Sequence, residues 1–162
     1  MIGKIGILDT NIYIYLSKLS NDEVRRSVLY ITSFYKLKKI WIPRYVKDEL
    51  MLDRNKRIQR VLEILELFGP VEPCPLKNNR VVKKIKKGGD IDLGESDVIM
   101  QIVEFATLPK SRLRKYSALG LDILFFTNDL AALRCSFVNA KGIYWRKVAE
   151  DIRSKLGIPI EY

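Results

Sequence analysis

Short apolar runs alternate along this chain with longer segments in which apolar residues recur every three or four positions. The first pattern predicts strands and the second predicts helices. Strands that alternate with helices favour an α/β fold built on a parallel sheet. We expect strands at 5–8, 40–42, 123–126 and 142–145, and helices at 10–19, 22–37, 45–68 with a break near 53–55, 94–106, 128–135 and 147–156.

The run Ile123–Phe126 is the strongest strand candidate, because four apolar residues in succession fit a strand that is buried on both faces. The chain has 162 residues, which suits one domain with one core. No internal repeat, low-complexity tract or linker-like stretch interrupts it. We therefore expect a single domain over 1–162.

Composition places the protein among soluble globular chains, with 48% hydrophobic and 30% charged residues. No apolar run approaches the roughly 20 residues of a membrane helix, and the first residues do not resemble a signal peptide. A cytoplasmic protein with no membrane partner is expected. The net charge of +10 favours a polyanionic partner such as nucleic acid. A highly charged surface of the heat-adapted kind is the alternative.

The residue types exclude several kinds of chemistry. There is no histidine, which removes Ser-His-Asp and Cys-His mechanisms. The two cysteines, Cys74 and Cys135, cannot form a disulfide framework or a four-ligand zinc site. Any metal must be bound by oxygen, and an enzyme of this composition depends on carboxylates or on a metal.

Acidic residues follow the two best strand candidates. Asp9 follows the apolar run of GILDTN, and Asp129 ends FFTND. In open parallel sheets, ligands bind beyond the carboxyl ends of the strands, so both acids are candidates for one site. The alternative for each is a helix N-cap. Glu49, on the helix after the second strand, is a further candidate, and its alternative is a solvated helical glutamate.

The segment 90–97 holds several acids at the start of a predicted helix, where the helix dipole favours carboxylates in any case. Glu95 is in line with the apolar stripe that runs through Val98 and Ile102. An acid on a buried face needs a partner. Asp97 lies about 200° further around the helix.

At this point the chain resembles the PIN domain family of nucleases. Four short motifs carry the resemblance in the family's order, and the ordered series is more specific than any one of them. They are LDTN at 8–11, Glu49 on its helix, LGESD at 93–97 and TND at 127–129.

The resemblance implies a three-layer α/β/α sandwich with a short, mainly parallel sheet. It also implies a four-carboxylate site that binds Mg²⁺ or Mn²⁺ and hydrolyses RNA phosphodiester bonds. Asp9, Glu49 and Asp129 match the family's first, second and last acids, and the third is either Asp97, by local pattern, or Glu95, by helical position. Residues expected to orient the acids, or simply to cap helices, are Thr10, Asn11, Thr127 and Asn128.

Two basic runs flank the third acidic cluster. Such residues contact phosphates without reading sequence, and the alternative is that each run is a solvated helix face. The nucleic-acid-binding candidates among them are Lys83, Lys84, Lys86, Lys87, Arg112 and Arg114.

The leading hypothesis is thus a metal-dependent endoribonuclease, either the toxin of a toxin–antitoxin pair or an RNA-processing enzyme. Its expected partners are RNA and, for a toxin, an antitoxin protein. Pairing with a second copy of the chain, as a homodimer, is a further alternative. The alternatives are a non-catalytic RNA-binding or scaffold protein with the same fold, and another acidic-pocket α/β protein such as a receiver or phosphatase.

Overall fold

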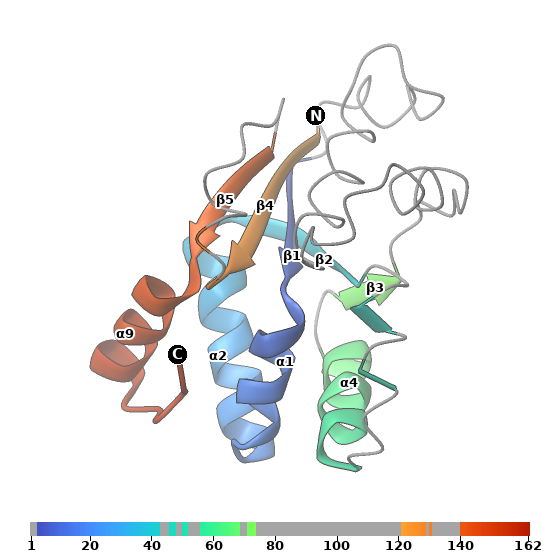
Figure 1. Cartoon of the computed structure of the whole chain (residues 1–162), viewed down its shortest axis with the longest axis vertical. Helices are drawn as coiled ribbons and strands as arrows, with labels where there is room; N and C mark the ends of the chain where they lie inside the picture. Colours follow the sequence, from blue (N-terminus) through green and yellow to red (C-terminus); the bar gives the residue numbers. More distant parts are fainter. Residues whose placement is uncertain are drawn as a thin grey trace.

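Among the residues that the structure describes, five parallel strands form one sheet in the computed structural model (Figure 1). They are β1 Gly3–Leu8, β2 Leu37–Ile42, β3 Val71–Pro73, β4 Leu121–Thr127 and β5 Ala140–Tyr144. Their order across the sheet is β3-β2-β1-β4-β5. The described residues are 3–42, 46–47, 50–51, 56–68, 71–73, 121–128, 130 and 140–162.

Helices pack beside one another against this sheet. Those described from end to end are α1 Thr10–Ser17, α2 Asn21–Phe34, α4 Lys56–Phe68 and α9 Trp145–Leu156, and residues 46–47, 50–51 and 130 are also helical. α2 contacts β2, α4 and α9, and α1 contacts α4. Figure 1 shows these helices side by side at the end of the sheet toward which the arrows of β1, β4 and β5 point. The expected α/β fold with a parallel sheet is confirmed.

The strand order reverses direction at β1. From β1 the chain proceeds outward through β2 to β3, and on the other side of β1 it proceeds outward through β4 to β5. In open parallel sheets, such a switch point leaves a crevice beyond the carboxyl ends of the two strands. The residues that follow Leu8 and Phe126 are therefore the candidates for lining a ligand site.

The core covers both faces of the central strands. Residues 123–127 are buried in succession, although neighbouring side chains of a strand point to opposite faces. The expectation that this strand is buried on both faces is confirmed. In β1, a Cβ on Gly6 would lie 2.7 Å from Leu37 Cδ1, so the absence of a side chain at Gly6 leaves room for the Leu37 side chain in the core. No helix among the described residues is both long and apolar enough to cross a membrane.

Several predicted boundaries are wrong. α2 begins with a capping box, in which Ser20 Oγ accepts from Glu23 N at 3.2 Å and Glu23 Oε1 accepts from Ser20 N at 3.0 Å. It ends at Phe34 rather than at residue 37, because Lys36 has a left-handed φ of 53° that turns the chain. Leu37 then enters β2, three residues before the predicted start of that strand.

Two other elements differ from expectation. The predicted strand at 142–145 is one residue too long at its end, since Trp145 is fully buried as the first residue of α9. β3 was not predicted, because three residues that include a proline carry almost no strand pattern. It is paired through Ile40↔Val71 to the edge of β2.

The last residues of the chain are held against α9 and α1. The indole N–H of Trp145 donates to Glu161 O at 3.0 Å, and Arg153 Nε donates to Ile160 O at 2.6 Å. Lys18 and Glu161 form an exposed ion pair at 3.0 Å. The turn into this tail is made by Gly157, which ends α9 with a left-handed φ of 67°.

We expect Gly157→Ala to lower the free energy of unfolding by about 1 kcal/mol, because a Cβ disfavours this backbone conformation. A Cβ here has no other atom within 4 Å, so the loss would come from the backbone alone. Gly157→Asn is the control, since asparagine tolerates the left-handed region better. Urea unfolding measures all three proteins, and equal stability of the alanine and glycine forms would contradict the assignment.

Candidate active site

Asp9 occupies the point where β1 becomes α1. Its backbone is extended, with φ −64° and ψ 154°, and it is the N-cap of α1. Its N–H donates to Phe126 O at 2.9 Å and its carbonyl accepts from Ile12 N at 3.0 Å. The residue therefore continues the ladder to β4 on one side and begins the helix on the other.

The carboxylate of Asp9 is buried and accepts hydrogen bonds from Thr10 and Thr127. Only 7% of the residue is exposed. Oδ1 accepts from Thr10 N at 2.7 Å, which is the helix cap. Oδ2 accepts from Thr127 Oγ1 at 2.7 Å. A carboxylate has about four acceptor positions, so its oxygens can accept these bonds and still take part in binding a cation.

Thr127 brings β4 to this carboxylate. It is the last residue of β4 and is completely buried. The β1–β4 register places Leu8 opposite Phe126, so the residues that follow each of them are level with each other at the strand ends. The hydroxyl of Thr127 is thus directed at Asp9 by the sheet itself, and it fixes the orientation of the carboxylate as an outer-shell partner would.

Asn128 anchors the same loop to α9. Its Oδ1 accepts from Arg146 N at 3.1 Å. The N-cap residue of that helix, Tyr144, makes no side-chain capping bond, so Asn128 supplies the cap from another part of the chain. The interpretation of Asn128 as a helix cap is right, although it caps α9 rather than a helix that follows it directly.

The other two predicted supporting residues differ from each other. Thr10 is buried and contributes its backbone N–H to Asp9. Asn11 is exposed in the first turn of α1. Tyr13, also in α1, is completely buried, and its hydroxyl has no hydrogen-bond partner among the residues that the structure describes. Burial raises the pKa of Tyr13, so this phenol stays neutral and cannot act as a base at ordinary pH.

Most of the predicted site residues lie outside the described part of the chain. Among the described residues, no three acids or cysteines are grouped as a metal site would require, and Asp9 is the one member of the predicted set of four that they include. The predictions outside the described residues are Glu49, Glu95, Asp97, Asp129, Lys83, Lys84, Lys86, Lys87, Arg112 and Arg114.

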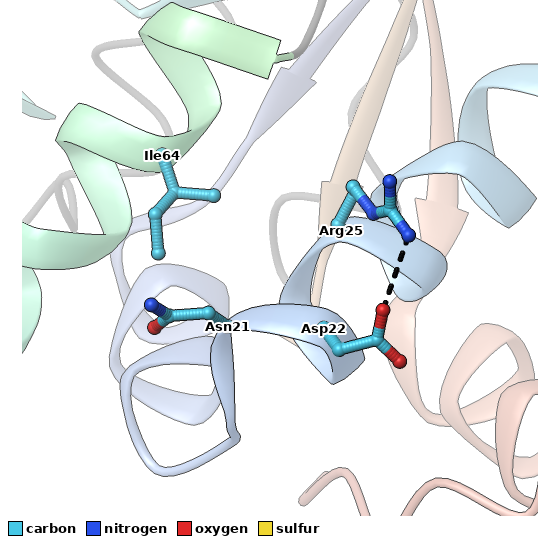
Figure 2. Close-up of a pocket in the computed structure, with 4 residues that line it drawn as sticks. All are labelled: Asn21, Asp22, Arg25 and Ile64. Atoms are coloured by element: carbon cyan, nitrogen blue, oxygen red, sulfur yellow. Dashed lines mark hydrogen bonds and ion pairs between the residues drawn. The ribbon is translucent and has the colours of Figure 1, made fainter.

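A separate hollow of about 260 Å³ lies at the N-terminus of α2 (Figure 2). Asn21, Asp22 and Arg25 of α2 line it together with Ile64 of α4. Asp22, an acid in this lining, accepts a hydrogen bond from Arg25 Nη2 at 3.1 Å. The hollow is separated from Asp9 by the eight residues of α1, which span about 12 Å. It therefore does not belong to the site at Asp9.

The sequence offered a signal for Asp9 and Thr127 but none for the contact between Asn128 and Arg146. Both acid-bearing motifs follow apolar runs, whereas a cap supplied from 18 residues away has no local pattern. No protein-family model matches this chain, and no curated protein or solved structure is similar enough to count as a match. A proposal for the function therefore rests on the chemistry and geometry of the residues around Asp9.

Substituting Thr127→Val should lower the free energy of unfolding by about 1.5–3 kcal/mol, because it removes a donor from a buried carboxylate. Thr127→Ser keeps the hydroxyl and loses one buried methyl, so its expected loss is only about 0.8 kcal/mol. Valine preserves the side-chain volume of threonine, so if packing alone mattered, Thr127→Val would be more stable than Thr127→Ser. Denaturant unfolding of both variants shows which of the two is the more stable.

The same pair of substitutions in an Asp9→Ala background isolates the hydrogen bond. There the difference between valine and serine at position 127 should shrink or reverse, because the acceptor is gone. An undiminished difference would assign the effect to packing around Thr127.

Proposed function

We propose that this protein is a divalent-metal-dependent endoribonuclease that hydrolyses RNA phosphodiester bonds at a carboxylate site beside Asp9. The observation that carries the proposal is the buried Asp9 carboxylate, held by Thr10 and Thr127 at the carboxyl ends of β1 and β4. A ligand site is expected at this switch point of the sheet. An acid that only capped α1 would need the bond from Thr10 but not the one from Thr127.

The proposed fold is a three-layer α/β/α sandwich of the PIN type. Two features support it. The sheet is parallel with β1 between β2 and β4, and the consecutive burial of residues 123–127 requires cover on both faces of β4. Parallel sheets with both faces covered are typical of sandwiches of this kind.

The proposed metal is Mg²⁺ or Mn²⁺. Both take oxygen ligands, and the chain has no histidine to provide others. Asp9 would hold the ion together with Asp129, Glu49 and a third acid, Asp97 or Glu95. When bound, the ion lowers the pKa of a water molecule and offsets charge on the phosphate. Thr127 would keep the carboxylate of Asp9 in position as the ion exchanges.

The proposed substrate follows from charge. A net charge of +10 favours a polyanion, and the basic residues at 83–87 and 112–114 would contact RNA phosphates near the acids. In this proposal the protein serves either as the toxin of a toxin–antitoxin pair, where an antitoxin protein is its partner, or as an RNA-processing enzyme. The identity of the neighbouring gene distinguishes these roles.

We expect cleavage of a labelled RNA only with Mg²⁺ or Mn²⁺, and none in excess EDTA. Asp9→Asn should lower turnover by about 100-fold or more, since even outer-shell changes at metal sites cost 10–100-fold. Asparagine is also a good N-cap, so the fold should be retained. Asp22→Asn is the matched control, because Asp22 is an exposed acid at the start of another helix. Metal-independent cleavage, or equal activity of the two variants, would refute the proposal.

The third acid can be identified by comparing Asp97→Asn with Glu95→Gln. We expect Asp97→Asn to lose more Mn²⁺ affinity and more turnover than Glu95→Gln. The reason is that Asp97 is followed by apolar residues, which is the usual context of the third acid in the family that the chain resembles. Isothermal titration with Mn²⁺ and initial cleavage rates measure both effects. A loss confined to Glu95→Gln reverses the assignment, and a loss in neither removes both residues from the site.

A further inference from the structure

Two aromatic side chains stack on the outer surface of α2. Tyr30 and Phe34 are one helical turn apart, with ring centroids 5.6 Å apart and planes inclined by 20°. Phe34 is 54% exposed, which is high for a phenylalanine. Tyr30 is half-buried and packs against the core, so the pair forms a surface platform whose exposed ring is that of Phe34.

Cations from two helices border this platform. Lys155 of α9 places its Nζ 5.7 Å from the Tyr30 ring centre and 5.3 Å from that of Phe34. Arg26, one turn before Tyr30 on α2, donates from Nη2 to Leu156 O at 3.4 Å. Arg26, Tyr30, Phe34 and Lys155 are called the α2–α9 patch below. The patch thus combines ring surface with two positive charges.

A chain of ring contacts links the patch to the strand end beside Asp9. Phe34 meets Tyr35 edge to face at 4.9 Å, and Tyr35 meets Phe126 edge to face at 5.1 Å. Phe126 in turn accepts the backbone hydrogen bond of Asp9. The patch is therefore connected through Tyr35 to the strand that carries Thr127.

We propose that the α2–α9 patch binds single-stranded RNA, with a base stacked on Phe34 and backbone phosphates on Lys155 and Arg26. Surfaces that bind single strands combine cations that follow the backbone with aromatic rings on which bases stack. The proposal rests on the proposed function, since RNA is the substrate there. It extends that function to a contact outside the carboxylate site.

Charge decides between RNA and a protein partner. A protein that buried this platform would also have to desolvate Arg26 and Lys155, which is unfavourable unless acids meet them. A nucleic acid supplies stacking surface and phosphates together. Lys155 Nζ also donates to Tyr30 Oη at 3.4 Å. This long bond and the contact with the rings are both weak at an exposed site, so the ammonium can move to a phosphate when a base takes its place.

The test is binding of a fluorescein-labelled 12-nucleotide oligouridylate to the full chain in EDTA, so that no cleavage occurs. Phe34→Leu keeps an apolar side chain but removes the ring, and it should weaken binding about fivefold or more. Leu29→Ala is the matched control, because Leu29 is an exposed apolar residue of the same helix, 48% exposed. Its affinity should stay within about twofold of the unmodified chain.

An abasic oligomer of the same length separates stacking from charge. The effect of Phe34→Leu should disappear on it, whereas Lys155→Gln should still lower the salt dependence of binding, by about 0.7 in the slope of log affinity against log salt. Equal losses for Phe34→Leu and Leu29→Ala overturn the proposal. So does an effect of Phe34→Leu that persists on the abasic oligomer.

Sedimentation of the same variants tests the competing occupant. If Phe34→Leu changes the oligomeric state and leaves RNA affinity unchanged, the patch is an interface between copies of the chain and the RNA proposal is wrong. The two proposals also fail separately. If Phe34→Leu weakens RNA binding but the unmodified protein does not cleave RNA with Mg²⁺ or Mn²⁺, only the proposed nuclease function is refuted. If the protein cleaves RNA with these metals but Phe34→Leu leaves RNA binding unchanged, only the proposed RNA contact at the α2–α9 patch is refuted.

Discussion

Parallel pairing of β1 with β4 is the constraint on which the candidate site depends. The register is continuous over six residue pairs, from Gly3↔Leu121 to Leu8↔Phe126. It makes the two strands end level, so that Asp9 and Thr127 meet although 118 positions separate them in the chain. A slip by one residue would turn Thr127 to the other face of the sheet and leave Asp9 as a plain helix cap.

Much of this arrangement could be predicted because it rests on local patterns. The apolar runs before Asp9 and Thr127 locate β1 and β4. The unbroken hydrophobic run Ile123–Phe126 also predicts that β4 is buried on both faces. The predicted start of α2 at residue 22 is within one residue of its observed start at Asn21. The general rule for parallel sheets then places Asp9 and the residues after Phe126 at one rim.

What could not be predicted depends on contacts between distant residues. The left-handed turn at Lys36 ends α2 early, although lysine does not favour that conformation, because Leu37 is drawn into the core beside Gly6. β3 exists only through its pairing with β2. The hydrogen bond of Thr127 to Asp9 and the cap from Asn128 to Arg146 are equally non-local, so sequence patterns could suggest these residues as partners of a site but could not show what each one touches.

The separation of Asp9 and Thr127 in the chain has a consequence for folding. Their hydrogen bond joins positions that are 118 residues apart, so forming it requires the closure of a large loop. The hydrogen bond from Thr10 is local and can form together with α1. The bond from Thr127 forms only once β1 and β4 have paired, so the final orientation of the carboxylate is set late in folding, by the assembled sheet.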